Sequence, residues 1–255
     1  MPLLEVMNLK KIYTPHLGGT KVTALESVSF SVEQGEYVAV MGESGSGKTT
    51  LLNLLASLDK PTDGDILLDG RSLSKIKGSE LCAFRRDNLG FVFQDFNLLD
   101  TFSLRDNIYL PLVLQGFSAD VMEQRLMPLA KKLSITDILE KYPYEVSGGQ
   151  KQRAAVARAL ITNPKLVLAD EPTGALDSKS SSQLLKLFGS INADGQTIVM
   201  VTHSIQAASG AKRVLFIKDG TIFNQIYRGS RSDDEMYRTV SDTLTVLQTG
   251  GQENE

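Results

Sequence analysis

A glycine-rich stretch near the N-terminus has the residue types that hold phosphate groups. It reads, in order, Gly42, Glu43, Ser44, Gly45, Ser46, Gly47, Lys48 and Thr49. The glycines allow a sharp turn that aims backbone N–H groups inward, and a following helix adds the positive end of its dipole. We expect the Lys48 ammonium to reach the β- and γ-phosphates of a nucleoside triphosphate and the Thr49 hydroxyl to bind Mg²⁺.

The surroundings of this phosphate loop (42–49) argue against a chance run of glycine and serine. An apolar run over 38–41 precedes it and is typical of a buried strand, and 47–56 has a helical pattern. The motif requires this order of strand, loop and helix. By itself it predicts the binding of a nucleoside triphosphate and nothing more specific.

Two carboxylates end a second apolar run. Asp170 suits a Mg²⁺ ion bound through a water, and Glu171 suits a general base that polarises an attacking water. A solvated strand end would explain a lone Asp-Glu pair better. The phosphate loop and the residues that follow, 172–177, favour the catalytic interpretation here.

A third motif, the Ser-Gly-Gly-Gln turn, stands just before a helical run over 151–160 and consists of Ser147, Gly148, Gly149 and Gln150. A glycine pair at a helix N-terminus is a second anion site, although a helix start without a ligand would show the same residues. The chain thus has two phosphate-binding devices and one lysine-bearing loop. A head-to-tail pair of chains, in which the loop of one faces this turn of the other, would use both.

Three single side chains are weaker candidates. Gln94 follows a short strand and has an amide that can bind Mg²⁺ or orient water, and His203 follows a buried strand and could hydrogen-bond a γ-phosphate. Tyr13 could stack on adenine. Each of the three is also compatible with an ordinary structural role, and His16, in an expected loop, is assigned no chemistry.

The elements that must position these side chains follow an α/β pattern. Strand-like alternation fills about the first 40 residues, and helical periodicity dominates about 95–162. Three β-branched runs, at 165–170, 197–201 and 214–218, then alternate with helices. The sequence therefore predicts an α/β fold with a mostly parallel sheet, an N-terminal antiparallel β portion and an inserted α-helical subdomain.

We expect one catalytic domain over 1–230, with its core at 1–94 and 163–230, then a C-terminal helix and polar tail over 231–255. The spacing of Ser232 and Glu235 is that of a capping box at the start of this helix. Four apolar side chains then share one helical face: Met236, Val240, Leu244 and Leu247. That face is expected to pack on its own domain, and the alternative is a partner-binding stripe.

Composition narrows the class of protein. The chain has 255 residues and a net charge of −3, without the basic bias of a nucleic-acid binder. Its one cysteine, Cys82, cannot form an internal disulfide and fits a reducing cytoplasm. The start is not expected to be a signal peptide, and no apolar stretch approaches the roughly 20 residues of a membrane-spanning helix, so a membrane role is expected to need a partner.

The order of these motifs resembles the nucleotide-binding domains of ABC transporters over about residues 3–228. The family's Walker A loop, Q-loop, signature motif, Walker B motif, D-loop and switch histidine match, in turn, 42–49, Gln94, 147–150, 170–171, 175–177 and His203. Val146 stands where the family usually has leucine, which is a conservative departure. The resemblance implies a P-loop NTPase core that binds ATP and Mg²⁺ between two copies of itself and drives a membrane permease.

The resemblance also implies a role for each matched residue. The implied catalytic residues are Lys48, Glu171 and His203, and the implied Mg²⁺ ligands are Thr49, Gln94 and Asp170. The nucleotide is expected to contact Tyr13, Gln94 and all of 42–50, including Thr50. From the second copy it is expected to meet Ser147, Gly148, Gly149, Gln150 and Asp177.

Finer features resemble particular branches of the family. Residues 101–108 and 110–112 look like the macrolide-export, lipoprotein-release and cell-division ATPases, and 216–220, 226–229 and the terminal helix look most like bacitracin-resistance ATPases. This resemblance implies that the chain lies on the cytoplasmic face of a bacterial membrane and that its partners are a large permease and, through the permease, a sensor histidine kinase.

An ATPase that regulates or signals through a membrane partner, and moves no solute, stays open as the alternative. Translation-associated relatives carry two such domains in one chain, and this chain has a single set of motifs. DNA-repair relatives need a long coiled-coil insert, for which the roughly 100 residues between the phosphate loop and the Ser-Gly-Gly-Gln turn leave no room.

Overall fold

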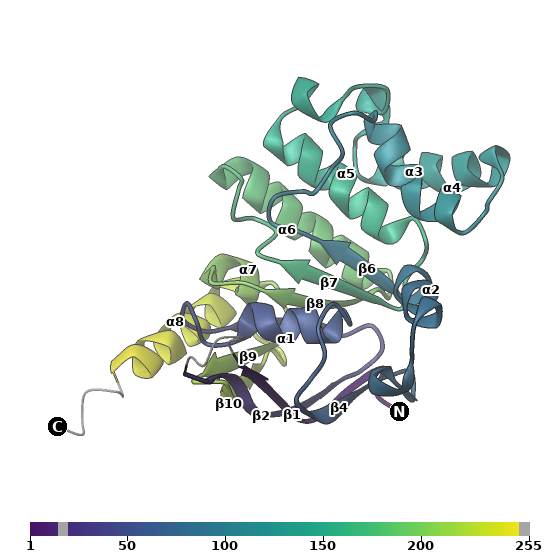
Figure 1. The fold of residues 1–255 in the computed structure, drawn as a ribbon. Helices are drawn as coiled ribbons and strands as arrows, with labels where there is room; N and C mark the ends of the chain where they lie inside the picture. Colours follow the sequence, from purple (N-terminus) through teal and green to yellow (C-terminus); the bar gives the residue numbers. More distant parts are fainter. Residues whose placement is uncertain (15–19, 250–255) are drawn as a thin grey trace. The chain divides into compact units, whose positions relative to one another are not determined.

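The computed structural model describes residues 1–14 and 20–249. His16 and its expected loop, and the expected polar tail from 250 to 255, lie outside the described residues. The chain divides into two compact units (Figure 1). The first unit combines Met1–Lys77 with Thr197–Glu255, and the second unit is Gly78–Gln196.

The first unit contains a mixed sheet. Its strands, in chain order, are β1 (Leu4–Tyr13), β2 (Val22–Val32), β3 (Tyr37–Met41), β4 (Asp63–Leu68), β5 (Arg71–Ser72), β8 (Thr197–Val201), β9 (Arg213–Lys218) and β10 (Thr221–Tyr227). They lie in the order β5-β4-β1-β2-β10-β9-β3-β8. β1 pairs antiparallel with β2 and β4, whereas β3 pairs in parallel with β8 and β9. Both the N-terminal antiparallel portion and the parallel strands were predicted.

Burial explains why these strands could be predicted from the sequence. Every residue of β3 and β8 is buried, as expected for central parallel strands, which are covered on both faces and read as continuous apolar runs. β2 mixes buried and exposed positions along its length instead. The phosphate loop leaves β3 and enters helix α1, which buries four leucines.

The remaining helices of the first unit are the short η1 (Leu73–Lys75), α7 (Ile205–Ser209) and α8 (Asp233–Thr249), with α1 spanning Lys48–Leu55. The capping box predicted for α8 is present, because the Ser232 N–H donates to Glu235 at 2.8 Å and the Glu235 N–H donates to Ser232 Oγ at 3.3 Å. α8 packs beside α7 (Figure 1) and buries Met236, Val240 and Leu247. Three of the four apolar side chains predicted to pack on their own domain are therefore buried, and the fourth, Leu244, is half-buried.

The second unit combines a parallel strand pair with helices. Its elements are α2 (Ser79–Asn88), β6 (Leu89–Val92), α3 (Leu104–Leu114), α4 (Ala119–Lys132), η2 (Thr136–Ile138), η3 (Pro143–Glu145), α5 (Gly148–Leu160), β7 (Leu166–Asp170) and α6 (Ser178–Ala193). β6 pairs with β7 in parallel, with Val92 opposite Ala169. α3, α4 and α5 contact one another and form the helical insert expected within the α/β core.

This unit spans more of the chain than the helical subdomain expected over 95–162. The difference arises because β6, β7 and α6 belong to the same compact unit. Among the described residues, no helix combines the length and apolar character needed to cross a membrane.

Candidate active site

The phosphate loop has the backbone that anion binding requires. Gly45 and Gly47 have φ angles of +81° and +102°, which only glycine adopts easily. A Cβ on Gly47 would lie 2.4 Å from the Ala24 carbonyl oxygen, so a larger residue would also clash with β2. Gly47 is the N-cap of α1 and has no side chain to cap it. A helix start without a side-chain cap is the arrangement found where helix N-termini bind anions.

The Lys48 side chain is hydrogen-bonded to two backbone carbonyls of the phosphate loop. Its Nζ donates to the carbonyl oxygens of Gly42 at 2.9 Å and Glu43 at 2.7 Å. Thr49 is exposed at the surface and Thr50 is half-buried. The structure thus presents the cation and the hydroxyl predicted for phosphate and Mg²⁺ on neighbouring residues of one helix turn.

His203 lies at the same sheet edge as the phosphate loop. The parallel pairing of β3 with β8 sets Val40 opposite Val201, and the Thr202 N–H donates to the Val40 carbonyl at 3.0 Å. Because both strands end at this edge, His203 follows β8 where the loop follows β3. The exposed His203 ring is therefore on the side of the sheet where open α/β folds bind their ligands.

Tyr13 ends β1 with its ring held by neighbours. Its hydroxyl donates to Asp59 Oδ2 at 3.0 Å, and Lys11 Nζ lies 2.7 Å from Asp59 Oδ1 and 4.8 Å from the ring centroid. Partial burial works to raise the pKa of Asp59, but hydrogen bonds from Lys11, the Lys60 N–H and Tyr13 outweigh it and lower that pKa. The ring is thereby fixed as an exposed aromatic surface, as the stacking role requires.

The second unit brings Gln94 to the acidic strand end. The β6–β7 pairing places Gln94 at the edge where Asp170 ends β7 and Glu171 follows it. A Cβ on Gly174 would lie 3.1 Å from Gln94 Cδ and Nε2, so the amide lies directly against the loop that follows Glu171. Glu171 itself has a φ of +43°, a conformation that costs energy for a non-glycine residue and is concentrated at functional sites.

The Ser-Gly-Gly-Gln turn is part of a helix, which corrects the expected start at 151. α5 begins at Gly148, with Ser147 as its N-cap. The Ser147 N–H donates to Gln150 Oε1 at 2.9 Å, and the Gln150 N–H donates to Ser147 Oγ at 3.4 Å. This reciprocal pair closes the first turn and starts the helix three residues earlier than its apolar pattern indicated.

Asp177 lies close to the same turn. It is the N-cap of α6, where it accepts from the Ser180 N–H at 2.9 Å and from Ser180 Oγ at 2.6 Å. These bonds from Ser180 lower the pKa of Asp177. A Cβ on Gly149 would lie 2.8 Å from Ser180 Oγ, so the residues predicted to reach a second copy's nucleotide gather in one place.

One residue was missed by sequence reasoning. Gln152 of α5 is fully buried, and its Nε2 donates to the carbonyl oxygens of Phe93 at 3.1 Å and Pro172 at 2.8 Å. It therefore links α5 to the residue before Gln94 and the residue after Glu171. The sequence did contain a signal: Gln152 shares a helical face with the apolar Ala155 and Val156, which predicts that it is buried. Because buried polar groups need hydrogen-bond partners, such a glutamine is expected to link neighbouring segments.

We expect Gln152→Ala to lower the free energy of unfolding by about 1–3 kcal/mol, because it leaves two buried carbonyls without their donor. Urea unfolding of the full chain measures this. Gln150→Ala is the control and should cost less, because Gln150 is only half-buried and the change removes just the capping bond from the Ser147 N–H. Equal stability of Gln152→Ala and the unaltered chain would contradict the bridging role.

Among the described residues, no group of three or more His, Cys, Asp or Glu side chains could hold a metal ion. The predicted Mg²⁺ set is of another kind: a hydroxyl from Thr49, an amide oxygen from Gln94 and a single carboxylate from Asp170. Such hard oxygen donors fit Mg²⁺, which takes few protein ligands and shares substrate phosphates. The ion and its ligands stay a prediction.

Comparison with known proteins shows what the chain resembles. Residues 25–174 match the ABC transporter family. The chain is 50% identical over 254 residues to the ABC transporter ATP-binding protein YxdL of Bacillus subtilis, which covers 99% of this chain and 96% of the relative. It is 46% identical over 256 residues to the bacitracin export ATP-binding protein BceA of Halalkalibacterium halodurans, which covers 100% of both.

A solved structure has the same fold. The dimeric ATP-binding cassette MJ0796 bound to ADP and Pi, a protein of Methanocaldococcus jannaschii, matches with a TM-score of 0.80 and 38% identity. The match covers 88% of this chain and 98% of the cassette. The predicted α/β architecture is confirmed by this likeness.

Proposed function

Because this chain belongs to the ABC transporter family of ATP-binding proteins, we propose that its ATPase activity drives a bacterial permease that gives resistance to cell-wall-targeting peptide antibiotics. The antibiotics would be of the bacitracin or lantibiotic type. One observation carries this finer assignment: the bacitracin export relative matches the chain from end to end, whereas the solved cassette matches 88% of it.

In the proposed cycle, residues of the first unit bind the triphosphate. The Lys48 ammonium and the N–H groups at the start of α1 bind the β- and γ-phosphates, and Tyr13 stacks on adenine. Lys48 is already positioned by the Gly42 and Glu43 carbonyls, so little reorganisation accompanies binding. Such preset charges are the main means of catalysing phosphoryl transfer.

Hydrolysis is proposed to use Glu171 and His203. Glu171 takes a proton from water as the water oxygen bonds to the γ-phosphorus, and the bond from that phosphorus to the β,γ-bridging oxygen breaks. His203 hydrogen-bonds the γ-phosphate and keeps it in line. Mg²⁺, when held by Thr49, Gln94 and Asp170, would neutralise charge on the phosphate oxygens.

We also propose that a second copy of the chain completes each site. Ser147 is exposed and Gly149 packs against Ser180, which holds Asp177, so these groups form one surface that a nucleotide on another copy can meet. The similar cassette was solved as a dimer, which supports this arrangement. Closure of the pair on ATP and its opening after hydrolysis would supply the movement that the permease uses.

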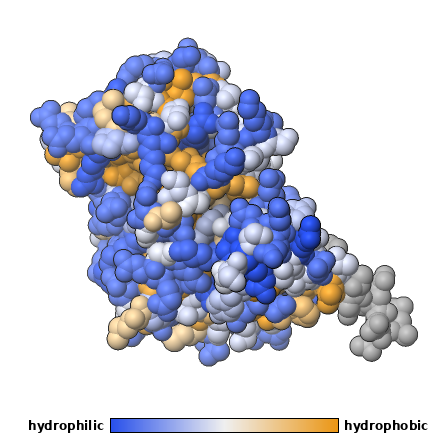
Figure 2. Space-filling model, turned by 180° about the vertical axis from the view of Figure 1, so that it is seen from behind, coloured by the Kyte–Doolittle hydropathy of each residue, from blue (hydrophilic) through white to orange (hydrophobic). Residues whose placement is uncertain are grey.

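The permease is proposed to dock on the loop between β6 and α3. Leu99 and Phe102 of this loop are 45% and 42% exposed, and Figure 2 shows apolar side chains on the surface of the same unit. Asn107, fully buried, fixes the loop: it accepts from the Leu99 N–H at 2.7 Å and donates to the Leu99 and Phe102 carbonyls. A loop that presents apolar side chains in a fixed conformation suits protein docking.

We expect Phe102→Asp to weaken association with the permease by about tenfold or more, as for a central apolar contact. Co-purification from membranes and permease-stimulated ATPase rates measure it, and the basal ATPase rate of the free chain should stay unchanged. Phe223→Asp, at a phenylalanine of β10 that is 52% exposed, is the matched control and should leave association intact. Wild-type association of Phe102→Asp would contradict this docking site.

The resistance function is tested by producing the chain with its cognate permease in a sensitive bacterium. Tolerance of bacitracin or a lantibiotic should rise, and Glu171→Gln should abolish the gain. A neighbouring gene for a permease with a large extracellular insert identifies the partner to use. Unchanged tolerance with an active ATPase would contradict the proposal, and vesicles that show no solute flux would favour regulation or signalling, including through a sensor histidine kinase.

A further inference from the structure

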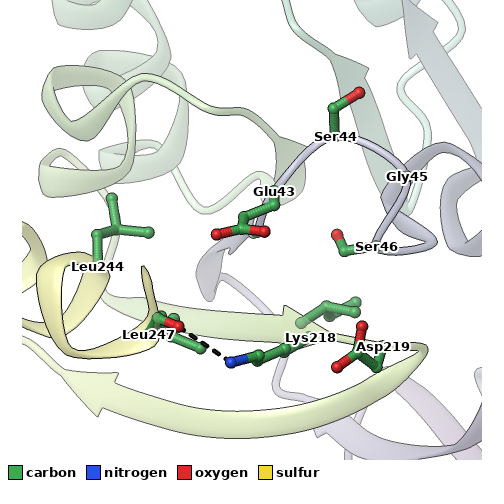
Figure 3. A pocket seen from close by; sticks show the side chains of 10 residues that line it. Glu43, Ser44, Gly45, Ser46, Lys218, Asp219, Leu244 and Leu247 are labelled. Atoms are coloured by element: carbon green, nitrogen blue, oxygen red, sulfur yellow. Dashed lines mark hydrogen bonds between the residues drawn. The ribbon is translucent and has the colours of Figure 1, made fainter. Parts of the chain in front are cut away.

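The last turns of α8 lie opposite the phosphate loop across a pocket. A pocket of about 140 Å³ lies between them, with Gly42, Glu43 and Ser46 on the loop side and Leu244 and Leu247 on the helix side (Figure 3). Ser46 is only 7% exposed, and its Oγ has no hydrogen-bond partner among the described residues. The loop and the helix therefore share a boundary that is close but incompletely packed.

Lys218, the last residue of β9, ties α8 to this place. Its Nζ donates to the Leu247 carbonyl oxygen at 3.0 Å, drawn as the dashed line in Figure 3. The C-terminal end of a helix carries partial negative charge, and α8 has no basic residue of its own in its last turn. β9 thus supplies the cation that the helix end lacks.

The same end of β9 also supports the phosphate loop. The Gly220 N–H donates to the Ser46 carbonyl at 3.3 Å, and a Cβ on Gly42 would lie 2.2 Å from the Ile217 carbonyl oxygen. Residues 217–220 are therefore in contact with the loop on one side and with the end of α8 on the other. A shift of the helix end reaches the loop through this segment without any other element.

We propose that Lys218 is a positioning residue for nucleotide binding: by docking the last turns of α8, it holds the phosphate loop in its binding conformation. A loop that is already ordered binds phosphate more tightly, because less freedom is lost on binding. Coupling of this kind is reciprocal, so bound nucleotide must also hold α8 more firmly. The proposal rests on the function proposed above, in that the loop binds ATP.

The test uses the full chain and a non-hydrolysable ATP analogue with Mg²⁺, followed by calorimetry. Lys218→Ala should raise the Kd by about fivefold or more, the usual lower range of such coupling. Lys218→Arg keeps a cation in reach of the Leu247 carbonyl and should restore most of the affinity. The catalytic rate at saturating ATP should change little, because Lys218 touches no reacting atom.

A matched control separates positioning from stability. Lys212, the residue just before β9, donates to the Gly35 carbonyl at 2.8 Å, a bond of the same kind away from the loop. Lys212→Ala should lower the melting temperature about as much as Lys218→Ala and leave the Kd unchanged. A variant lacking 244–255 keeps the buried Met236 and Val240 anchors and should raise the Kd as Lys218→Ala does.

Hydrogen exchange gives the reciprocal measurement. The analogue should slow exchange of the amides at 244–247 in the unaltered chain, and much less in Lys218→Ala. A wild-type Kd in both Lys218→Ala and the shortened variant would overturn the positioning role while leaving the ATPase function intact. Failure of the unaltered chain to bind any adenine nucleotide would overturn both.

Discussion

Glu171→Gln is expected to slow ATP turnover by about 10²–10⁴ and to leave ATP binding intact, which is the usual share of a general base in the rate. Glutamine has the shape of glutamate but cannot take the proton of the attacking water. The backbone at this position, with φ at +43°, should be kept because the two side chains are alike beyond the Cβ. Phosphate release under saturating ATP, together with a binding titration, measures both quantities.

Glu26→Gln provides the control, because this exposed carboxylate of β2 lies in the first unit, outside the proposed machinery. It should hydrolyse ATP at the rate of the unaltered chain. Wild-type turnover by Glu171→Gln would refute its role as the base.

The same variant also reports on the shared site. Because it binds ATP without consuming it, Glu171→Gln should accumulate as a dimer when ATP is added, alone or on the permease. Sedimentation with and without ATP measures this state. A strictly monomeric protein under every condition would remove the case for Ser147 and Asp177 acting on the nucleotide of another copy.

Much of the fold was predictable because its signals are local. The strands β3, β7 and β8 are short apolar runs with almost every residue buried. The start of α8 is indicated by a capping box. Proline was a weaker guide, since Pro111 lies inside α3 although proline usually disrupts a helix interior. Packing of Leu104, Ile108 and Leu112 stabilises that helix enough to tolerate the missing N–H.

The residue types of the candidate site could be predicted from the sequence, but the hydrogen bonds that position these residues could not. Motif order predicted functional roles for the phosphate loop, Gln94 and Glu171 from sequence alone. The bonds that position them join distant residues: Gln152 reaches Phe93 across 59 positions, and Tyr13 reaches Asp59 across 46. No periodic sequence pattern predicts such pairs. The catalytic roles of the site residues stay predictions that the variants test.

Lys48→Ala is expected to have the second large effect, and on a different quantity. It removes a cation that would make one or two charge-assisted hydrogen bonds to phosphate, worth about 1.5–3 kcal/mol each. ATP binding should therefore weaken by about tenfold or more, and turnover should fall further because charge on the γ-phosphoryl group is left without its partner. Equilibrium binding of a fluorescent ATP analogue and steady-state phosphate release separate the two losses.

Lys48→Arg distinguishes charge from geometry. Arginine keeps the cation, but its planar fork cannot occupy the place where one ammonium donates to both the Gly42 and Glu43 carbonyls. If those bonds preset the loop, the arginine variant should bind ATP better than Lys48→Ala and still turn over slowly. Normal hydrolysis by Lys48→Ala would refute the phosphate grip. Full activity of Lys48→Arg would show instead that positive charge alone suffices, and that the carbonyl bonds of Lys48 contribute nothing to the rate.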